Sequence, residues 1–319
     1  MVRNFYINLA SRNYQYCYCL RVLASKIIFL IFHISAISVQ AQKVYPNYQN
    51  HIEEWHQKRI NNLKSETGWL TVSGLFWLEE GENTFGSAKD NKIVFPSGKA
   101  DLQRGSFVLL KDEVRLTILP NIEVKRNDTI FITGIIFNKD TEEQSVILSH
   151  RNLRWFIIKR GNKYAVRLRD LESDARKNFT HIDRFPIDEK WKMNATFEAP
   201  KDKKTIPIHD VIGNTTETEF GGTLKFEING KQYSLDATLE NEEDLFIVFG
   251  DYTNGIKTYG AGRFLYAKKP KEGNKVILDF NKAYNPPCAF TDFATCPLPP
   301  DQNKLPIEVV AGELKYGNH

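Results

Sequence analysis

The sequence predicts a mainly β protein, with antiparallel sandwich or barrel-like sheets, one N-terminal helix and a long proline-rich C-terminal loop. Three observations predict this fold class. Short β-branched and aromatic runs follow one another from residue 69 onward. Turn-forming residues interrupt these runs about every ten residues, as in sandwiches and barrels. Only residues 48–64 combine helical spacing of apolar side chains with a length typical of a helix.

Residues 1–41 are expected to be a signal peptide. Residues 27–39 form an apolar stretch, interrupted by three polar side chains. A bilayer-spanning helix needs about 20 apolar residues, so this stretch is too short to span. Lys26 precedes it, and Val39-Gln40-Ala41 fits a small-x-Ala cleavage site. The protein is therefore expected to be exported, to the periplasm or as a secreted protein, with no stable membrane span after cleavage. An uncleaved anchor, or a buried strand or helix, is the alternative.

The charge of the remaining chain argues against nucleic acid as a partner. The whole sequence holds 43 Lys and Arg against 39 Asp and Glu. Four of the basic residues and none of the acidic ones lie in residues 1–41, so residues 42–319 hold 39 of each sign. A net charge of zero does not favour general polyanion binding, although a local arginine pocket remains compatible with it.

Residues 42–66 are expected to form an N-terminal helical segment, with the helix itself over residues 48–64. Ile52, Ile60 and Leu63 follow helical spacing, and Glu53 lies early in the run, where it favours the helix dipole. Gly68 ends the segment. This helix is expected to pack on the body of the domain.

Residues 67–319 are expected to form the β-rich domain. Hairpins are predicted around Gly161-Asn162 and Asn229-Gly230. The second is the clearer one, because Asn-Gly supplies both positive φ values of a type I′ turn. Further strands are predicted over 92–95, 106–110, 114–119, 129–133, 245–249 and 275–280. The charged segment 171–191 is either a seam between two β halves or a short helix across one face. Residues 284–306 contain six prolines and are expected to form a long loop, since proline removes ladder donors.

Several familiar site motifs are missing from the sequence. It contains no G-x-S-x-G, Walker or H-E-x-x-H motif and no EF-hand loop. No cofactor and no metal site can be assigned. The two cysteines after residue 41, Cys288 and Cys296, are too few for a zinc site. They are predicted to form a local disulfide, because disulfides persist in exported proteins. The alternative is a Cys288 nucleophile with His209 or His181 as its base.

A middle cluster contains Arg167, Asp170 and Arg176. Arg167 and Arg176 are candidates to clamp a carboxylate or phosphate, because guanidinium groups bind such anions through two parallel hydrogen bonds. Asp170 lies at the end of the same predicted strand. The alternative is a solvated strand edge with ion pairs of little energetic value.

A glycine-rich loop follows the predicted strand 245–249. Asp251 is a candidate acid or base, and Asn254, Tyr259 and Arg263 are candidate ligand-binding residues. Asp and Asn also form turns by bonding their own backbone, which is the structural alternative. Arg263 lies in an apolar run, so it needs a carboxylate partner, with Asp251 or Asp279 as candidates.

The proline-rich region opens with a third polar cluster. Asp279 and Tyr284 are candidate catalytic groups, and Asn281 and Asn285 are candidate ligand-binding amides. Cys288 follows directly and completes the catalytic candidates. Together these side chains would form the polar floor of a pocket on a rigid loop.

These motifs resemble the signature of domain-of-unknown-function family 1684 (DUF1684). The resemblance rests on residues 251–263, 279–290 and 294–303, on Gly74-Leu75-Phe76-Trp77-Leu78, and on the middle cluster. It extends over about residues 67–313. The family implies no activity, substrate or cofactor. It implies that the polar loop residues belong to a shared pattern, which suggests a common site.

Two functions follow as hypotheses. The first is an exported hydrolase that acts on a small anionic substrate at the polar loops. The alternative is a non-catalytic module for small-ligand binding or envelope interactions. The sequence does not indicate the oligomeric state.

Overall fold

The computed structural model of the chain describes residues 48–140 and 146–317. The predicted signal peptide lies outside the described residues, so its cleavage stays a prediction. No described helix is long and apolar enough to cross a bilayer.

The predicted N-terminal helix is confirmed as α2 (Tyr48–Lys64). Ile52, His56 and Leu63 form its buried face. The helix is followed by Gly68 and the 3-10 turn η1 (Trp69–Thr71). A Cβ atom at Gly68 would lie 2.1 Å from the Leu63 carbonyl oxygen, so only glycine allows the chain to turn this closely against the helix end.

The first β region contains two sheets. The six-stranded sheet has the order β1-β11-β10-β9-β6-β7 and is antiparallel throughout. The five-stranded sheet has the order β3-β2-β4-β5-β8, in which only β2 and β3 are parallel. The bounds are β1 (Val72–Trp77), β2 (Gly81–Gly86), β3 (Ile93–Val94), β4 (Gly105–Leu110), β5 (Glu113–Ile118), β6 (Lys125–Arg126), β7 (Thr129–Ile130), β8 (Thr133–Asn138), β9 (Leu148–His150), β10 (Leu153–Arg160) and β11 (Lys163–Asp170).

These two sheets share one core. Phe85 and Phe107 of the five-stranded sheet pack with Trp155 of the six-stranded sheet, and all three side chains are fully buried. The predicted Gly161-Asn162 hairpin is confirmed between β10 and β11, with Gly161 at φ 56°. The segment 171–191 then contains the short helix α3 (Asp174–Asn178) and the 3-10 turn η2 (Glu189–Trp191).

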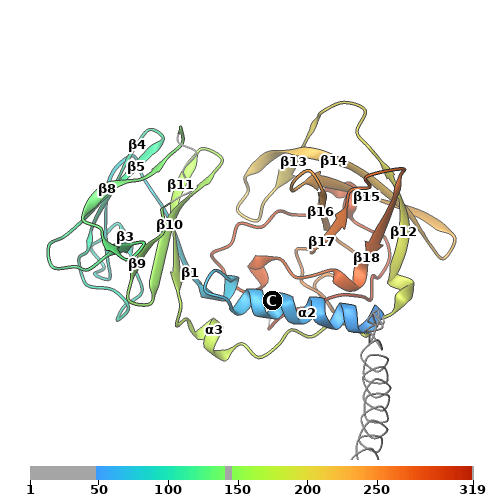
Figure 1. Cartoon of the computed structure of the whole chain (residues 1–319), viewed down its shortest axis with the longest axis horizontal. Coiled ribbons are helices and arrows are strands. Elements are labelled where there is room, and N and C mark those ends of the chain that lie inside the picture. Colours follow the sequence, from blue (N-terminus) through green and yellow to red (C-terminus); the bar gives the residue numbers. More distant parts are fainter. Residues whose placement is uncertain (1–47, 141–145, 318–319) are drawn as a thin grey trace, which may run out of the picture. The chain divides into compact units, whose positions relative to one another are not determined.

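The second β region is a seven-stranded, barrel-like sheet (Figure 1). Its order is β17-β16-β15-β14-β12-β18, with β13 paired to β14, and the end strands β17 and β18 also contact each other. The Asn-Gly hairpin is confirmed, with Asn229 at φ 51° and Gly230 at φ 77°. The bounds are β12 (Lys192–Glu198), β13 (Thr205–His209), β14 (Thr215–Ile228), β15 (Lys231–Leu239), β16 (Asp244–Phe249), β17 (Arg263–Lys268) and β18 (Lys275–Asp279). The predicted fold class is therefore confirmed.

The C-terminal segment after β18, which contains the proline-rich loop, completes the barrel core. It contains three 3-10 turns: η3 (Phe280–Lys282), η4 (Pro287–Ala289) and η5 (Asp301–Asn303). Leu305, Val309 and Ala311 from this segment are buried with Phe249 and Phe280 in the barrel core. The segment is thus an ordered part of the barrel rather than an appended tail.

Candidate functional site

Asp251 is held at the start of the glycine-rich loop by four hydrogen bonds. Its Oδ2 accepts from Arg263 Nη2 at 2.8 Å, and both side chains are fully buried. Its Oδ1 accepts from the backbone N–H and the hydroxyl of Thr253, at 2.8 and 2.6 Å, and from the Val309 N–H at 3.2 Å. Asp251 is therefore the carboxylate partner that the buried Arg263 requires. Of the two predicted partners, Asp251 and Asp279, the first is the one that pairs with it.

Arg263 connects β17 to the C-terminal segment. Its guanidinium donates to the carbonyl oxygens of Val309 and Ala311, at 2.9 and 2.5 Å. Burial lowers the pKa of Arg263, and the Asp251 carboxylate opposes that shift. Since the ion pair is enclosed on all sides, it stabilises the loop rather than offering charge to a ligand.

Asn254 and Tyr259 shape the same loop. Asn254 Oδ1 accepts from the Asp251 N–H at 2.5 Å, and its Nδ2 donates to the Tyr259 carbonyl oxygen at 2.8 Å. Tyr259 is half-buried against a small cluster that includes Leu70 and Phe290. Burial raises the pKa of Tyr259.

Asp279 and Asn281 join the barrel to the first residue of α2. Tyr48 donates its hydroxyl proton to Asp279 Oδ1 at 2.7 Å and accepts from Asn281 Nδ2 at 2.8 Å. Asn281 also donates to the Asp188 carbonyl oxygen. Burial and the Asp279 carboxylate raise the pKa of Tyr48 well above its usual range.

Tyr284 and Asn285 lie beside Arg59, which the sequence did not indicate as a site residue. The Arg59 guanidinium carbon lies 4.5 Å from the centre of the Tyr284 ring. Arg59 also pairs with Glu313 at 3.2 Å and donates to the Asn285 carbonyl oxygen at 2.8 Å. The Glu313 carboxylate, only 1% exposed, accepts the Asn285 N–H as well. Burial raises the pKa of Tyr284 well above its usual range, so its hydroxyl stays protonated.

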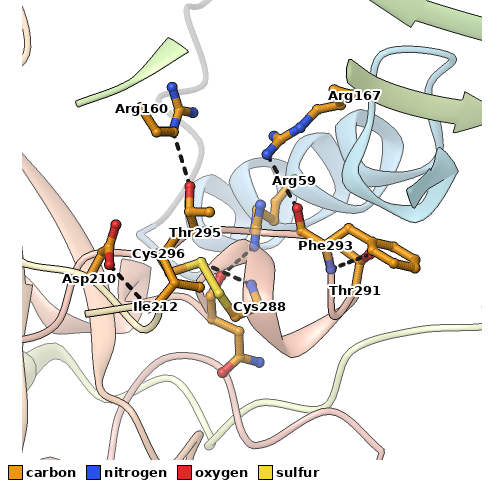
Figure 2. Close-up of a disulfide and its surroundings, with 11 residues drawn as sticks. Arg59, Arg160, Arg167, Asp210, Ile212, Cys288, Thr291, Phe293, Thr295 and Cys296 are labelled. Atoms are coloured by element: carbon orange, nitrogen blue, oxygen red, sulfur yellow. Dashed lines mark hydrogen bonds between the residues drawn. A yellow bond between two sulfur atoms is a disulfide. The ribbon is translucent and has the colours of Figure 1, made fainter. Parts of the chain in front are cut away.

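Cys288 and Cys296 form a disulfide in the structure, with their Cα atoms 6.2 Å apart (Figure 2). The ring that they close faces the six-stranded sheet. Arg160 Nε donates to Thr295 Oγ1 at 3.1 Å, and Arg167 Nη2 donates to the Phe293 carbonyl oxygen at 3.3 Å. Thr291 donates its hydroxyl proton to the Val72 carbonyl oxygen at 3.1 Å. The disulfide thus braces the loop that carries all three of these contacts, and this pairing leaves no free thiol at Cys288.

Arg167 is a buried arginine that lacks a carboxylate partner among the described residues. Its side chain is 3% exposed, and its guanidinium lies 5.2 Å from the centre of the Trp69 ring. Burial, with smaller contributions from Arg160 and Arg169, lowers the pKa of Arg167 to about 10.

The other members of the middle cluster bind elsewhere. Asp170 pairs with Lys99 at 3.0 Å. Arg176 donates to the carbonyl oxygens of Lys64 and Leu171, at 2.8 and 2.7 Å. Arg176 therefore fastens α3 to the end of α2 instead of sharing an anion with Arg167.

The predicted acids border two different cavities. Asp251 and Asn254 line a cavity of about 850 Å³ whose walls come from residues 206–209, 250–262 and 298–306. Asp279 lines another cavity, of about 500 Å³, beside the first turn of α2. The polar loops that the sequence grouped as one pocket floor are thus divided in space. Within the described ranges, no three His, Cys, Asp or Glu side chains lie together as metal ligands would.

Comparison with known proteins shows similarity to proteins without an assigned activity. A solution NMR structure of an uncharacterized protein from Haloarcula marismortui is 30% identical in sequence. The match covers 44% of this chain and 78% of that chain, with a TM-score of 0.37. No curated protein matches the chain. The family model described as protein of unknown function (DUF1684) matches residues 177–314. This region contains the motifs at residues 251–263, 279–290 and 294–303, whereas residues 74–78 and the middle cluster lie before it. The chain belongs to this family.

Proposed function

We propose that this protein is an exported, non-catalytic module that binds a small ligand in the cavity beside Asp251. The observation that carries the proposal is the cavity of about 850 Å³ between the glycine-rich and proline-rich loops. This volume falls in the range of small-molecule sites, roughly 300–1,000 Å³. All of its lining residues lie within the region that the family model matches.

The walls of this cavity are rigid, which favours binding because little conformational freedom is lost. Pro299 and Pro300 form one wall, and Gly262 faces them at φ 95°. A Cβ atom at Gly262 would lie 2.5 Å from Pro299 Cγ. The Asp251–Arg263 ion pair anchors the same loop from behind.

The contacts of Asp251 favour binding over hydrolysis. A general acid or base must reach the proton that it transfers. Both oxygens of Asp251 already accept hydrogen bonds inside the protein, and the side chain has no exposed surface. The remaining walls are mostly proline, glycine and aliphatic groups, with Tyr252, His209, Gln302 and the Asp301–Lys304 ion pair as polar members. The ligand class that fits is a small, largely apolar molecule with a few hydrogen-bonding or charged groups.

Export is part of the proposal. The short apolar stretch before residue 41 has the length and flanking charge of a signal peptide. The Cys288–Cys296 pair would persist in an oxidising compartment.

A cavity-filling variant tests the binding site. A Cβ atom at Gly260 would meet only backbone atoms of Gly255, at 3.8 Å or more, so Gly260→Phe is tolerated at the backbone while its ring narrows the cavity. A library of small aromatic fragments, screened by ligand-observed NMR, is expected to give binders whose affinity falls at least about tenfold in this variant.

Ala199→Phe provides the matched control, because it adds the same ring at an exposed position outside the cavity. Fragment binding should be unchanged in this control. The proposed site would be wrong if no fragment in the library bound the protein. It would also be wrong if Gly260→Phe and Ala199→Phe bound the fragments with equal affinity.

A further inference from the structure

A second cavity carries an excess of positive charge. It has a volume of about 500 Å³ and lies where β12, β17 and β18 meet the first turn of α2. Tyr48 and His51 of α2 form part of its wall. Five lysines line it: Lys192, Lys268, Lys269, Lys275 and Lys282.

The acids around this cavity do not balance the lysines. Asp279 is the one described acid in its lining, and its Oδ1 already accepts from Tyr48 and Asn281. Lys268 pairs with Asp244 at 2.7 Å. The other four lysines have no carboxylate within 4.0 Å among the residues that the structure describes. Residues 1–47 contain no Asp or Glu, so this part of the sequence cannot supply a counter-charge.

Two of these lysines contact aromatic side chains of α2. The Lys282 ammonium lies 2.9 Å from His51 Nε2, to which it can donate. The Lys192 ammonium lies 4.7 Å from the centre of the Tyr48 ring. Burial lowers the pKa of Lys282, and Lys192 adds to this effect, whereas Asp279 opposes it. Both ammonium groups line the same cavity, so an anion bound there would be attracted by the two together.

We propose that this cavity binds a phosphate-bearing ligand with at least two negative charges. Lysine ammonium groups are compact charges that bind phosphate oxygens from several directions. The cavity's volume of about 500 Å³ admits a diphosphate-sized group. Because residues 42–319 carry no net charge, the attraction is local to this cavity and does not spread over the molecule. The phosphate group can belong to a soluble small molecule or to a phospholipid headgroup.

Calorimetric titration of the mature protein with inorganic pyrophosphate tests this site. Pyrophosphate should bind the unmodified protein, and Lys192→Ala/Lys282→Ala should weaken binding at least about tenfold. The matched control is Lys163→Ala/Lys225→Ala, which removes two lysines outside the cavity and should change the affinity less than about twofold. Circular dichroism would verify that both variants are folded.

A second arm identifies the source of the phosphate. Cosedimentation with phosphatidylcholine vesicles that contain cardiolipin, whose headgroup carries two phosphates, reports headgroup binding. If Lys192→Ala/Lys282→Ala loses pyrophosphate binding, a soluble ligand is supported. If the same variant loses vesicle binding, a phospholipid headgroup is supported. If neither probe binds, or if both variants lose binding equally, the proposal is wrong. Gly260→Phe should leave pyrophosphate binding intact, which separates this result from the function proposed above.

Discussion

Asp251 and Arg263 determine whether the glycine-rich loop keeps its shape. Asp251→Asn preserves the size of the side chain but leaves the buried guanidinium without a counter-charge. Removing one partner of a buried pair typically costs about 3–5 kcal/mol. Urea unfolding should therefore give a free energy of unfolding lower by about this amount.

Asp244→Asn serves as the comparison, because Asp244 pairs with the exposed Lys268. Surface pairs contribute about 0–1 kcal/mol, so this variant should unfold almost like the unmodified protein. Equal losses in the two variants would mean that the buried pair has no special structural role.

His56 makes the stability depend on pH. Its Nε2 donates to the Ile182 carbonyl oxygen at 3.2 Å, and its buried Nδ1 has no partner. Burial lowers the pKa of His56 from 6.5 in the folded protein. The unfolded chain thus takes up the proton at a higher pH than the folded one, and the free energy of unfolding falls as the pH decreases below about 6.5.

Urea unfolding at about pH 7.5 and about pH 5.5 measures this effect. The unmodified protein should lose more stability between the two conditions than His56→Gln. The pKa of His150 is also lowered by burial, but His150 is present in both proteins, so the difference between them reports on His56. If the free energy of unfolding depended on pH identically in the two proteins, His56 would not be the source of the effect.

The sequence predicted that Arg263 pairs with a carboxylate. It did not predict the other hydrogen bonds and ion pairs around Asp251 and Arg59. Asp251 binds the N–H of Val309, 58 residues later, and Arg59 pairs with Glu313 across 254 residues. Residue types and local spacing carry no information about such separations.

At the scale of elements, local signals were sufficient where a turn or a helix decides the structure. Asn229-Gly230 predicted a hairpin because both residues tolerate positive φ, and α2 followed from its apolar spacing. The pairing of β12 with β18 and of β1 with β11 could not be predicted, because each pair joins strands that are far apart in the chain.

The disulfide holds the loop between Cys288 and Cys296 against the six-stranded sheet. Breaking this bond should loosen the contact between the loop and the sheet. Cys288→Ser/Cys296→Ser is expected to lower the free energy of unfolding by about 2–3 kcal/mol, as closure of a loop of this size implies. Alkylation of the native mature protein should modify no cysteine, and alkylation after reduction should modify both.

Two free thiols in the native protein would contradict the disulfide. Cys288 would then return as a candidate nucleophile. Arg160→Ala distinguishes the loop contact from the covalent bond, because it removes the bond to Thr295 while both cysteines remain. Arg160→Ala should lower the free energy of unfolding by less than the double cysteine variant does.

At the scale of the molecule, the chain builds two large cores that share no residue. One lies in the first β region around Trp155, and the other lies in the barrel around Phe280. The alternation of apolar residues predicted strands in both regions. It could not predict which sheets share a core, since any sheet with one apolar face can pack on any other.

The last prediction concerns the residue at which the mature chain begins. Intact mass spectrometry of protein from an exporting host should give a chain that begins at Gln42, because the apolar stretch is short and a cleavage sequence follows it. Such a chain would hold 39 basic and 39 acidic residues. Leu30→Arg should prevent export, because it places a charge in the apolar stretch, and should leave the full-length mass. A full-length mass for the unmodified protein in the envelope fraction would instead identify an uncleaved anchor.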